Sequence, residues 1–129
     1  MGQTGRMSPD AASELTLFHN PRCSKSRAAL AAVTEAGVSA RVVEYLKDAP
    51  TRAELLDLLG KLEDPPGALV RRDPAFREAG LSDADVATAD QVAEVLAARP
   101  QLMERPVLVR GDRAIIGRPT ERVAPFLQG

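Results

Sequence analysis

The chain has 129 residues and carries 17 Lys and Arg against 18 Asp and Glu, which gives a formal net charge of -1. A hydrophobic fraction of 44% supplies enough apolar material for a single core. The near-neutral charge and the lack of a basic block argue against nucleic acid as a partner, so any anion site must be local. No apolar run of about 18 residues could span a membrane, and the N-terminus lacks the apolar segment of a secretory signal. We therefore expect a cytoplasmic protein.

The N-terminal part predicts a strand, a helix and a second strand. Residues 1–13 are small and polar and predict a flexible leader, so a single domain would span residues 14–129. The segment LTLF is typical of a short buried strand. From Ser24 the sequence is rich in helix formers until Gly37, a residue suited to a helix C-terminus. ARVVEYL predicts the next strand, and the two strands of such a βαβ unit pair in parallel.

The middle of the chain, about residues 51–100, predicts a helical insertion. Thr51 followed by Glu54 is a capping-box pattern, and leucines at helical spacing come after it. Short helical turns are predicted in PPGALVRRD and PAFREAG, and a further helix should end before Pro100.

The C-terminal part returns to strands. VLV and AII predict a short hairpin around residues 110–113. Residues 119–127 predict a last helix that Pro125 bends or shortens. The complete order predicts an α/β, thioredoxin-like fold with a mixed β-sheet, in which the helical insertion separates an N-terminal βαβ unit from a C-terminal ββα unit.

The only cysteine, Cys23, lies where the predicted loop enters the first predicted helix. Unpaired backbone N–H groups and the positive end of the helix dipole favour a thiolate there. Arg22, Lys25 and Arg27 add positive charge, so we expect a pKa below the ~8.5 of a free cysteine. A buried, inert thiol is the commoner fate of a single Cys in a reducing compartment. The polar neighbours and the position in the first helical turn favour the reactive interpretation.

Two further polar residues near Cys23 each allow two interpretations. Ser26 completes a CxxS spacing, and its hydroxyl could bond the sulfur or satisfy a backbone N–H of the helix terminus, but it cannot resolve a mixed disulfide. His19, the only histidine, either tunes the thiol electrostatically or holds the turn. One Cys and one His cannot fill a zinc site, so no metal is expected.

Four segments, HNPRCSKSR, ALVRRD, ERPVLV and IGRPTE, occur in this order along the chain. Together they resemble the glutaredoxin-dependent arsenate reductase family of the ArsC type, which is related to the Spx regulators. The resemblance runs from about Leu15 to Leu127 and is greatest to the short, tail-less members. In this family the cysteine of the loop is the nucleophile, which corresponds to Cys23. His19 shares that loop as a candidate catalytic residue.

The resemblance also implies supporting and substrate-binding residues. Asn20 and Ser26 would support the loop, and Pro106 would follow a cis peptide bond and face the cysteine, although base rates alone favour a trans bond. Three arginines of the family hold the oxyanion, and they correspond to Arg71, Arg105 and Arg118. Planar guanidinium groups suit this task because they bind oxyanions bidentately. Because Arg72 follows directly, the sequence leaves open which arginine of the pair faces the site.

The function implied is reduction of arsenate to arsenite. With one thiol in the chain, the electrons must come from outside, and the resemblance identifies glutathione as the reducing co-substrate and glutaredoxin as a partner, with no bound cofactor. Two alternatives remain open. One is an Spx-like redox regulator that binds RNA polymerase, although those proteins commonly carry CxxC. The other is a general glutaredoxin-like thiol-disulfide exchanger, for which the arginines would be incidental.

Overall fold

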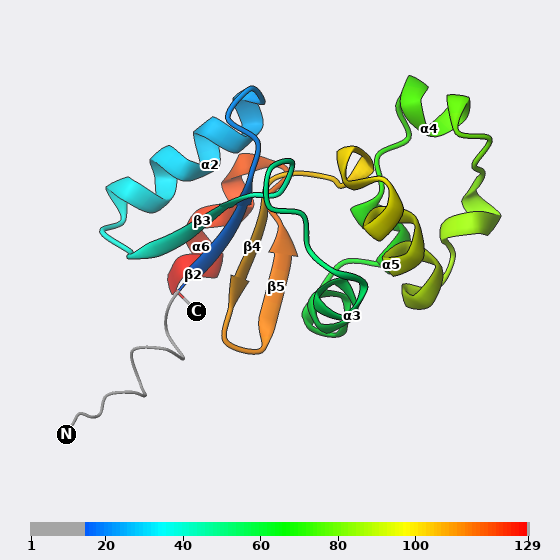
Figure 1. The fold of residues 1–129 in the computed structure, drawn as a ribbon. Coiled ribbons are helices and arrows are strands. Elements are labelled where there is room, and N and C mark those ends of the chain that lie inside the picture. The colour runs from blue at the N-terminus through cyan, green and yellow to red at the C-terminus, as the bar shows by residue number, and fades with distance from the viewer. Residues whose placement is uncertain (1–14, 129) are drawn as a thin grey trace.

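A mixed four-stranded sheet forms the centre of the computed structural model, which describes residues 15–128 (Figure 1). The strand order is β3-β2-β4-β5. The strands are β2 (Leu15–His19), β3 (Ala40–Glu44), β4 (Val107–Arg110) and β5 (Arg113–Ile116). β2 pairs in parallel with β3, whereas β2 with β4 and β4 with β5 pair antiparallel. This arrangement confirms the predicted thioredoxin-like α/β fold. The predicted leader, residues 1–13, lies outside the described residues.

Helices connect and cover the strands. The α-helices are α2 (Ser24–Glu35), α3 (Arg52–Lys61), α4 (Pro74–Glu78), α5 (Ala89–Ala98) and α6 (Val123–Gln128). Short 3-10 turns are η1 (Pro66–Leu69), η2 (Asp83–Val86), η3 (Pro100–Leu102) and η4 (Thr120–Arg122). The segment from α3 to η3 lies between β3 and β4 in the chain, where the helical insertion was predicted.

Most local signals produce the predicted elements. Gly37, which follows the C-cap residue Ala36 of α2, has φ 71°, a backbone conformation that favours glycine. Thr51 and Glu54 form both hydrogen bonds of the capping box. The hairpin turns at Gly111, with φ 64°. Each of these three signals lies within a few residues of the helix end or turn that it specifies.

Two predicted elements need correction. The second strand was predicted to continue to residue 46, but β3 ends at Glu44 because the N–H groups of Lys47 and Asp48 both donate to the Glu44 carbonyl and turn the chain. The last segment divides into η4 and the six-residue α6. Pro125 lies in the first turn of α6, where the missing N–H costs little.

Hydrophobic side chains cover both faces of the sheet. On one face, Leu17 of β2 and Leu108 of β4 pack with residues of α2 and α6. On the other, Val107 and Ile116 pack with the buried residues of α3, α5 and the short turns of the insertion. Because strand residues alternate between faces, β2, β4 and β5 contribute to both clusters, whereas β3 contributes only Ala40, which packs against the cluster of α2 and α6. This cluster attaches the insertion to the sheet. Figure 1 shows α3 and α5 on the side of β5.

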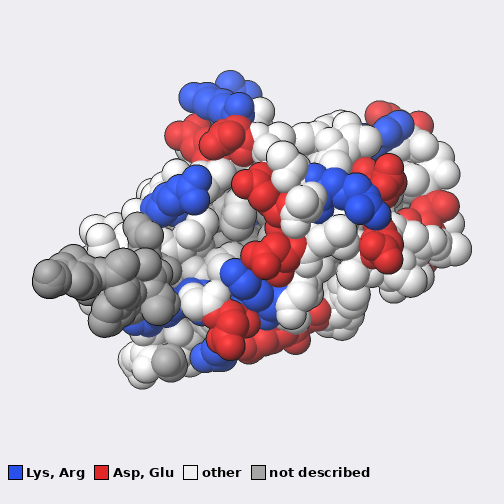
Figure 2. Space-filling view, turned by 60° about the horizontal axis from the view of Figure 1, so that its bottom comes forward, with Lys and Arg blue, Asp and Glu red and all other residues white. Residues whose placement is uncertain are grey.

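The surface carries charges of both signs. Lys and Arg side chains lie next to Asp and Glu side chains over the face seen in Figure 2. Within residues 15–128, no helix is both long and apolar enough to cross a bilayer.

Candidate active site

The predicted nucleophile lies in a tight loop between β2 and α2. Cys23 is the N-cap of α2 and has an extended backbone, with φ -96° and ψ 123°. Its N–H donates to the Asn20 carbonyl at 3.0 Å, and the N–H of Arg22 donates to the Asn20 side-chain oxygen at 3.0 Å. Asn20 therefore closes the loop through both its backbone and its side chain. The partly exposed thiol stands at the first turn of α2.

The buried side chains of His19 and Ser26 are hydrogen-bonded to each other next to this loop. The Asn20 N–H donates to Ser26 Oγ at 3.0 Å, and Ser26 Oγ lies 2.8 Å from His19 Nδ1. Burial lowers the pKa of His19, and Arg27 lowers it further against an opposing effect of Glu44. A neutral ring offers Nδ1 as an acceptor for the Ser26 hydroxyl proton. Both side chains are buried, and these hydrogen bonds hold the loop against α2.

The pKa of Cys23 is lowered, as expected, but the cations responsible differ from those predicted. Burial alone raises this pKa. The backbone N–H groups of Ser26 and Lys25, together with the side chain of Arg105, lower it by more than burial raises it. The helix terminus acts as predicted, whereas the cationic side chain comes from a distant part of the chain. Arg27 instead donates to the Pro21 carbonyl at 2.9 Å.

Arg105 and Arg118 reach the thiol from the C-terminal unit. Nη2 of Arg118 lies 3.5 Å from Cys23 Sγ, and Nε of Arg118 donates to the Arg105 carbonyl at 2.7 Å. The peptide bond between Arg105 and Pro106 is cis, which confirms that expectation, and the bond between Arg118 and Pro119 is also cis. The two arginines flank the hairpin of β4 and β5, so their side chains converge although 12 residues separate them in the chain.

Gly117 contributes to this convergence, and sequence analysis did not identify it. Its N–H donates to the Pro106 carbonyl at 2.9 Å. A Cβ atom at this position would lie 2.9 Å from Leu108 Cδ1 and 3.0 Å from Pro106 Cγ. The close approach of the two segments therefore requires a residue without a side chain immediately before Arg118.

Arg71 joins the site through an isolated backbone bridge. Val70 pairs antiparallel with Met103, and the N–H of Arg71 donates to the Leu102 carbonyl at 2.8 Å. This pairing places Arg71 beside Glu104, with its Nη1 3.6 Å from Glu104 Oε1. Arg72 faces elsewhere. Its guanidinium donates to the Gly67 and Val70 carbonyls and forms an ion pair with Asp83. Of the two neighbouring arginines, Arg71 is therefore the one that reaches the Glu104 carboxylate, which also neighbours Arg118.

Glu104 is a residue of this cluster that sequence analysis missed. Its Oε1 lies 3.4 Å from Arg118 Nε and accepts the N–H of Arg105 at 3.2 Å. The Glu104 N–H donates to the Leu69 carbonyl at 2.7 Å, which completes the bridge on the other side of Met103. The carboxylate thus lies among all three predicted arginines. The signal was its place directly before Arg105, but nothing in the sequence showed that Arg71 would lie opposite.

Several buried polar atoms of this cluster have no hydrogen-bond partner within the described chain. They are the Tyr45 hydroxyl and the Nε atoms of Arg71 and Arg105, of which Arg71 Nε lies 3.4 Å from Asp73 Oδ2 in an ion pair. Tyr45 is fully buried, and burial raises its pKa, while Arg105, Asn20 and Arg71 act in the opposite direction. Buried donors without partners are costly unless a ligand or water satisfies them. Tyr45 lies near both arginines, so these atoms together indicate a polar binding site.

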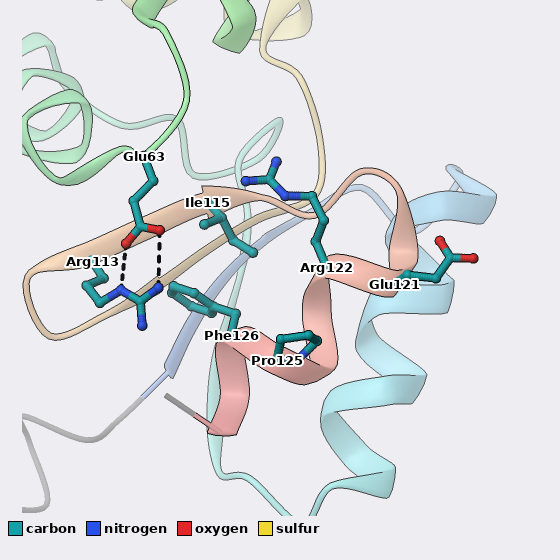
Figure 3. A pocket seen from close by; sticks show the side chains of 7 residues that line it. All are labelled: Glu63, Arg113, Ile115, Glu121, Arg122, Pro125 and Phe126. Atoms are coloured by element: carbon teal, nitrogen blue, oxygen red, sulfur yellow. Dashed lines mark hydrogen bonds and ion pairs between the residues drawn. The ribbon is translucent and has the colours of Figure 1, made fainter.

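Two cavities differ in their relation to the Cys23 loop, because one lies apart from the loop and the other is lined by it. One of about 410 Å³ lies at β5 and α6, where the Arg113 guanidinium forms two hydrogen bonds with the Glu63 carboxylate (Figure 3). Its other arginine, Arg122, pairs with Asp64 at 3.0 Å. A cavity of about 210 Å³ lies beside the loop and is lined by His19 to Arg22 and the turn after β3. Within residues 15–128, no group of three His, Cys, Asp or Glu residues is arranged to hold a metal ion.

Comparison with known proteins places this geometry in a family. The sequence model described as the ArsC family matches residues 18–126. The arsenate reductase of Neisseria meningitidis is 39% identical over 116 residues, covering 88% of this chain and 98% of that protein. An arsenate reductase of Escherichia coli is 34% identical over 116 residues, covering 89% of this chain and 82% of that protein.

A solved structure gives the same result. The arsenate reductase from Vibrio cholerae superposes with a TM-score of 0.79 at 33% sequence identity, covering 88% of this chain and 97% of that chain. The family match includes the Cys23 loop, the Val70 to Met103 bridge and the hairpin that carries Arg105 and Arg118. The chain belongs to the ArsC family.

Proposed function

We propose that the protein is an arsenate reductase that depends on glutathione and glutaredoxin. The observation that carries the proposal is the contact between Arg118 Nη2 and Cys23 Sγ at 3.5 Å, with the pKa of Cys23 lowered by Arg105. A thiolate beside guanidinium groups can attack an oxyanion that those groups bind. The names of the relatives from Neisseria meningitidis and Vibrio cholerae support arsenate as that oxyanion.

In the first step, Cys23 Sγ forms a bond to arsenic, and an As–O bond breaks. The departing oxygen leaves as water after protonation. Arg71, Arg105 and Arg118 hold the remaining oxygens and stabilise their negative charge. The buried Nε of Arg105 has no hydrogen-bond partner in the described chain and is a donor suited to this role. His19 and Ser26 hold the loop, so we assign them positioning roles, along with Asn20 and Pro106.

The later steps need external thiols. Arsenate and two thiols give arsenite, one disulfide and one water, so the two electrons come from two sulfur atoms. Cys23 is the only cysteine of the chain and Ser26 cannot form a disulfide, so the chain alone cannot complete the reduction. Glutathione would attack Cys23 Sγ in the adduct, so that an S–S bond forms, the S–As bond breaks and arsenite leaves with its electron pair. Glutaredoxin would then reduce the mixed disulfide between Cys23 and glutathione and regenerate the thiol. This chemistry needs no bound cofactor or metal, and it suits a reducing, cytoplasmic compartment.

The test is arsenite production by the purified protein. We expect sustained release with arsenate, glutathione and glutaredoxin, and loss of activity in Cys23→Ser. A control variant, Ser24→Ala, changes the exposed neighbour of Cys23 and should retain activity. Absence of arsenite in the complete mixture would contradict the proposal. Reduction of mixed disulfides that arsenate does not inhibit would indicate a general thiol-disulfide exchanger instead.

A further inference from the structure

Glu104 places a carboxylate where the proposed function requires an anion to bind. Its Oε1 lies 3.6 Å from Arg71 Nη1 and 3.4 Å from Arg118 Nε. The Arg118 guanidinium contacts Glu104 with Nε and Cys23 Sγ with Nη2. A single guanidinium group therefore separates the carboxylate from the thiol. An oxyanion bound by Arg118 at the sulfur would therefore lie on the same guanidinium group that Glu104 contacts.

The backbone of Glu104 is held firmly in this position. Its N–H donates to the Leu69 carbonyl at 2.7 Å, and Met103 beside it is buried and paired with Val70. The Glu104 side chain is only 23% exposed. The carboxylate also accepts a hydrogen bond from the backbone N–H of Arg105 at 3.2 Å. An oxyanion can bind without breaking this hydrogen bond. These contacts favour a carboxylate that stays in place when a ligand binds.

We propose that Glu104 is a specificity-determining residue that selects oxyanions carrying a proton. A carboxylate has only acceptors, so it can bond an oxyanion oxygen only where that oxygen bears hydrogen. Hydrogen arsenate and hydrogen phosphate keep a proton near neutral pH, whereas sulfate has none. An O–H···O⁻ bond to a carboxylate is short and strong, while an unprotonated oxygen in the same place meets like charge without compensation. The inference rests on the proposed function and defines its substrate class.

The competing interpretation is that Glu104 only fills the empty site and leaves when an oxyanion enters. Neutralising the carboxylate would then strengthen the binding of every oxyanion by the same factor. If Glu104 selects for a proton, neutralising it instead changes the ratio of the affinities for a protonated and an unprotonated oxyanion. Slightly above neutral pH, phosphate and sulfate are both mostly dianions, so this pair differs in the proton and hardly in charge.

The experiment measures how phosphate and sulfate protect Cys23 from alkylation by iodoacetamide, at constant ionic strength. We compare the wild-type protein with Glu104→Gln, whose amide offers both a donor and an acceptor in nearly the same volume. In the wild type, phosphate should protect at lower concentration than sulfate. In Glu104→Gln, the ratio of the two half-protection concentrations should shift toward sulfate by about tenfold or more, the size expected for one hydrogen bond to a charged group.

Two control variants separate charge from structure. Glu121 lies three residues after Arg118, is exposed and forms no ion pair among residues 15–128. The variant Glu121→Gln should therefore keep the wild-type ratio. Glu104→Asp keeps the charge and should keep the preference for phosphate even where its affinity for both anions falls. An unchanged ratio in Glu104→Gln would overturn the inference, as would equal shifts in Glu104→Gln and Glu104→Asp.

The assay also separates this inference from the proposed function, because protection of the thiol does not require reduction of arsenate. Phosphate selectivity that depends on Glu104, in a protein that releases no arsenite, would retain the inference and reject the reductase. Release of arsenite with no phosphate preference in the wild type would retain the reductase and reject the inference.

Discussion

Burial raises the pKa of Cys23, and the N–H groups of Ser26 and Lys25 and the side chain of Arg105 lower it by more. The deprotonated thiol should therefore be populated at lower pH than in a free cysteine. We expect the rate of alkylation by iodoacetamide to rise with pH to a midpoint below ~8.5. Arg105→Gln removes one lowering contact and should move the midpoint upward. A wild-type midpoint at or above the free-thiol value would contradict activation of Cys23.

Arg118 contacts the thiol directly, so its loss should weaken oxyanion binding. Arg118→Ala removes a charge-assisted donor, which is worth about 1.5 to 3 kcal/mol, or roughly ten- to a hundredfold in affinity. Arg77→Ala is the matched control, because Arg77 is exposed on α4 and forms no ion pair within the described part of the chain. Titration with arsenate, together with melting temperatures, provides the measurement. Equal affinities for arsenate in the two variants would remove Arg118 from the site.

Single residues of the candidate site differ in how far the sequence could predict them. Cys23 was predicted from its own surroundings, since a helix N-terminus and polar neighbours are local features. Glu104 and Tyr45 were not, because Arg71 approaches Glu104, and Arg71 and Arg105 approach Tyr45, only in the folded chain. The ambiguity between Arg71 and Arg72 likewise ends only where Val70 pairs with Met103.

At the scale of elements, local signals predicted most boundaries. The capping box of α3 and Gly37 after α2 each depend on residues a few positions apart. The end of β3 was predicted two residues too late, because Tyr45 and Leu46 continue the apolar character of ARVVEYL beyond the turn at Glu44. The close contact of Gly117 with Pro106 and Leu108 could be predicted only from the glycine itself. A glycine is equally typical of a turn, so this signal was ambiguous.

Gly117 and Gly60 allow a prediction about these elements. A Cβ at Gly117 would lie 2.9 Å from Leu108 Cδ1, whereas a Cβ at Gly60 has no atom within 4 Å. We expect Gly117→Ala to lower the free energy of unfolding by about 1 to 3 kcal/mol through overpacking. Gly60→Ala, in α3, should raise it by about 0.5 to 1 kcal/mol, because alanine favours a helix more than glycine. Urea unfolding measures the free energy of unfolding of both variants. If Gly60→Ala lowered it and Gly117→Ala did not, the close packing around Gly117 would be contradicted.

At the scale of the whole molecule, the site lies where three units meet. The βαβ unit supplies the Cys23 loop, the insertion supplies Arg71, and the ββα unit supplies Arg105 and Arg118. Two hydrophobic clusters on opposite faces of the sheet fix these units to one another. The thiol and the arginines are therefore brought together by the tertiary fold, and the site should be lost when the insertion detaches from the sheet.

The whole chain also limits the reaction that it can complete alone. Its one cysteine provides a single thiol, and its three methionines are thioethers that do not exchange with disulfides. Because arsenate needs two electrons to become arsenite, we expect reduced protein and arsenate to give at most a one-to-one adduct and no sustained arsenite release. Adding glutathione and then glutaredoxin should restore repeated turnover. Intact-mass measurement and arsenite assays follow the two stages, with Cys23→Ser as the control that forms no adduct. Several arsenite molecules released per protein without any added thiol would show that the electrons have another source and would reject this mechanism.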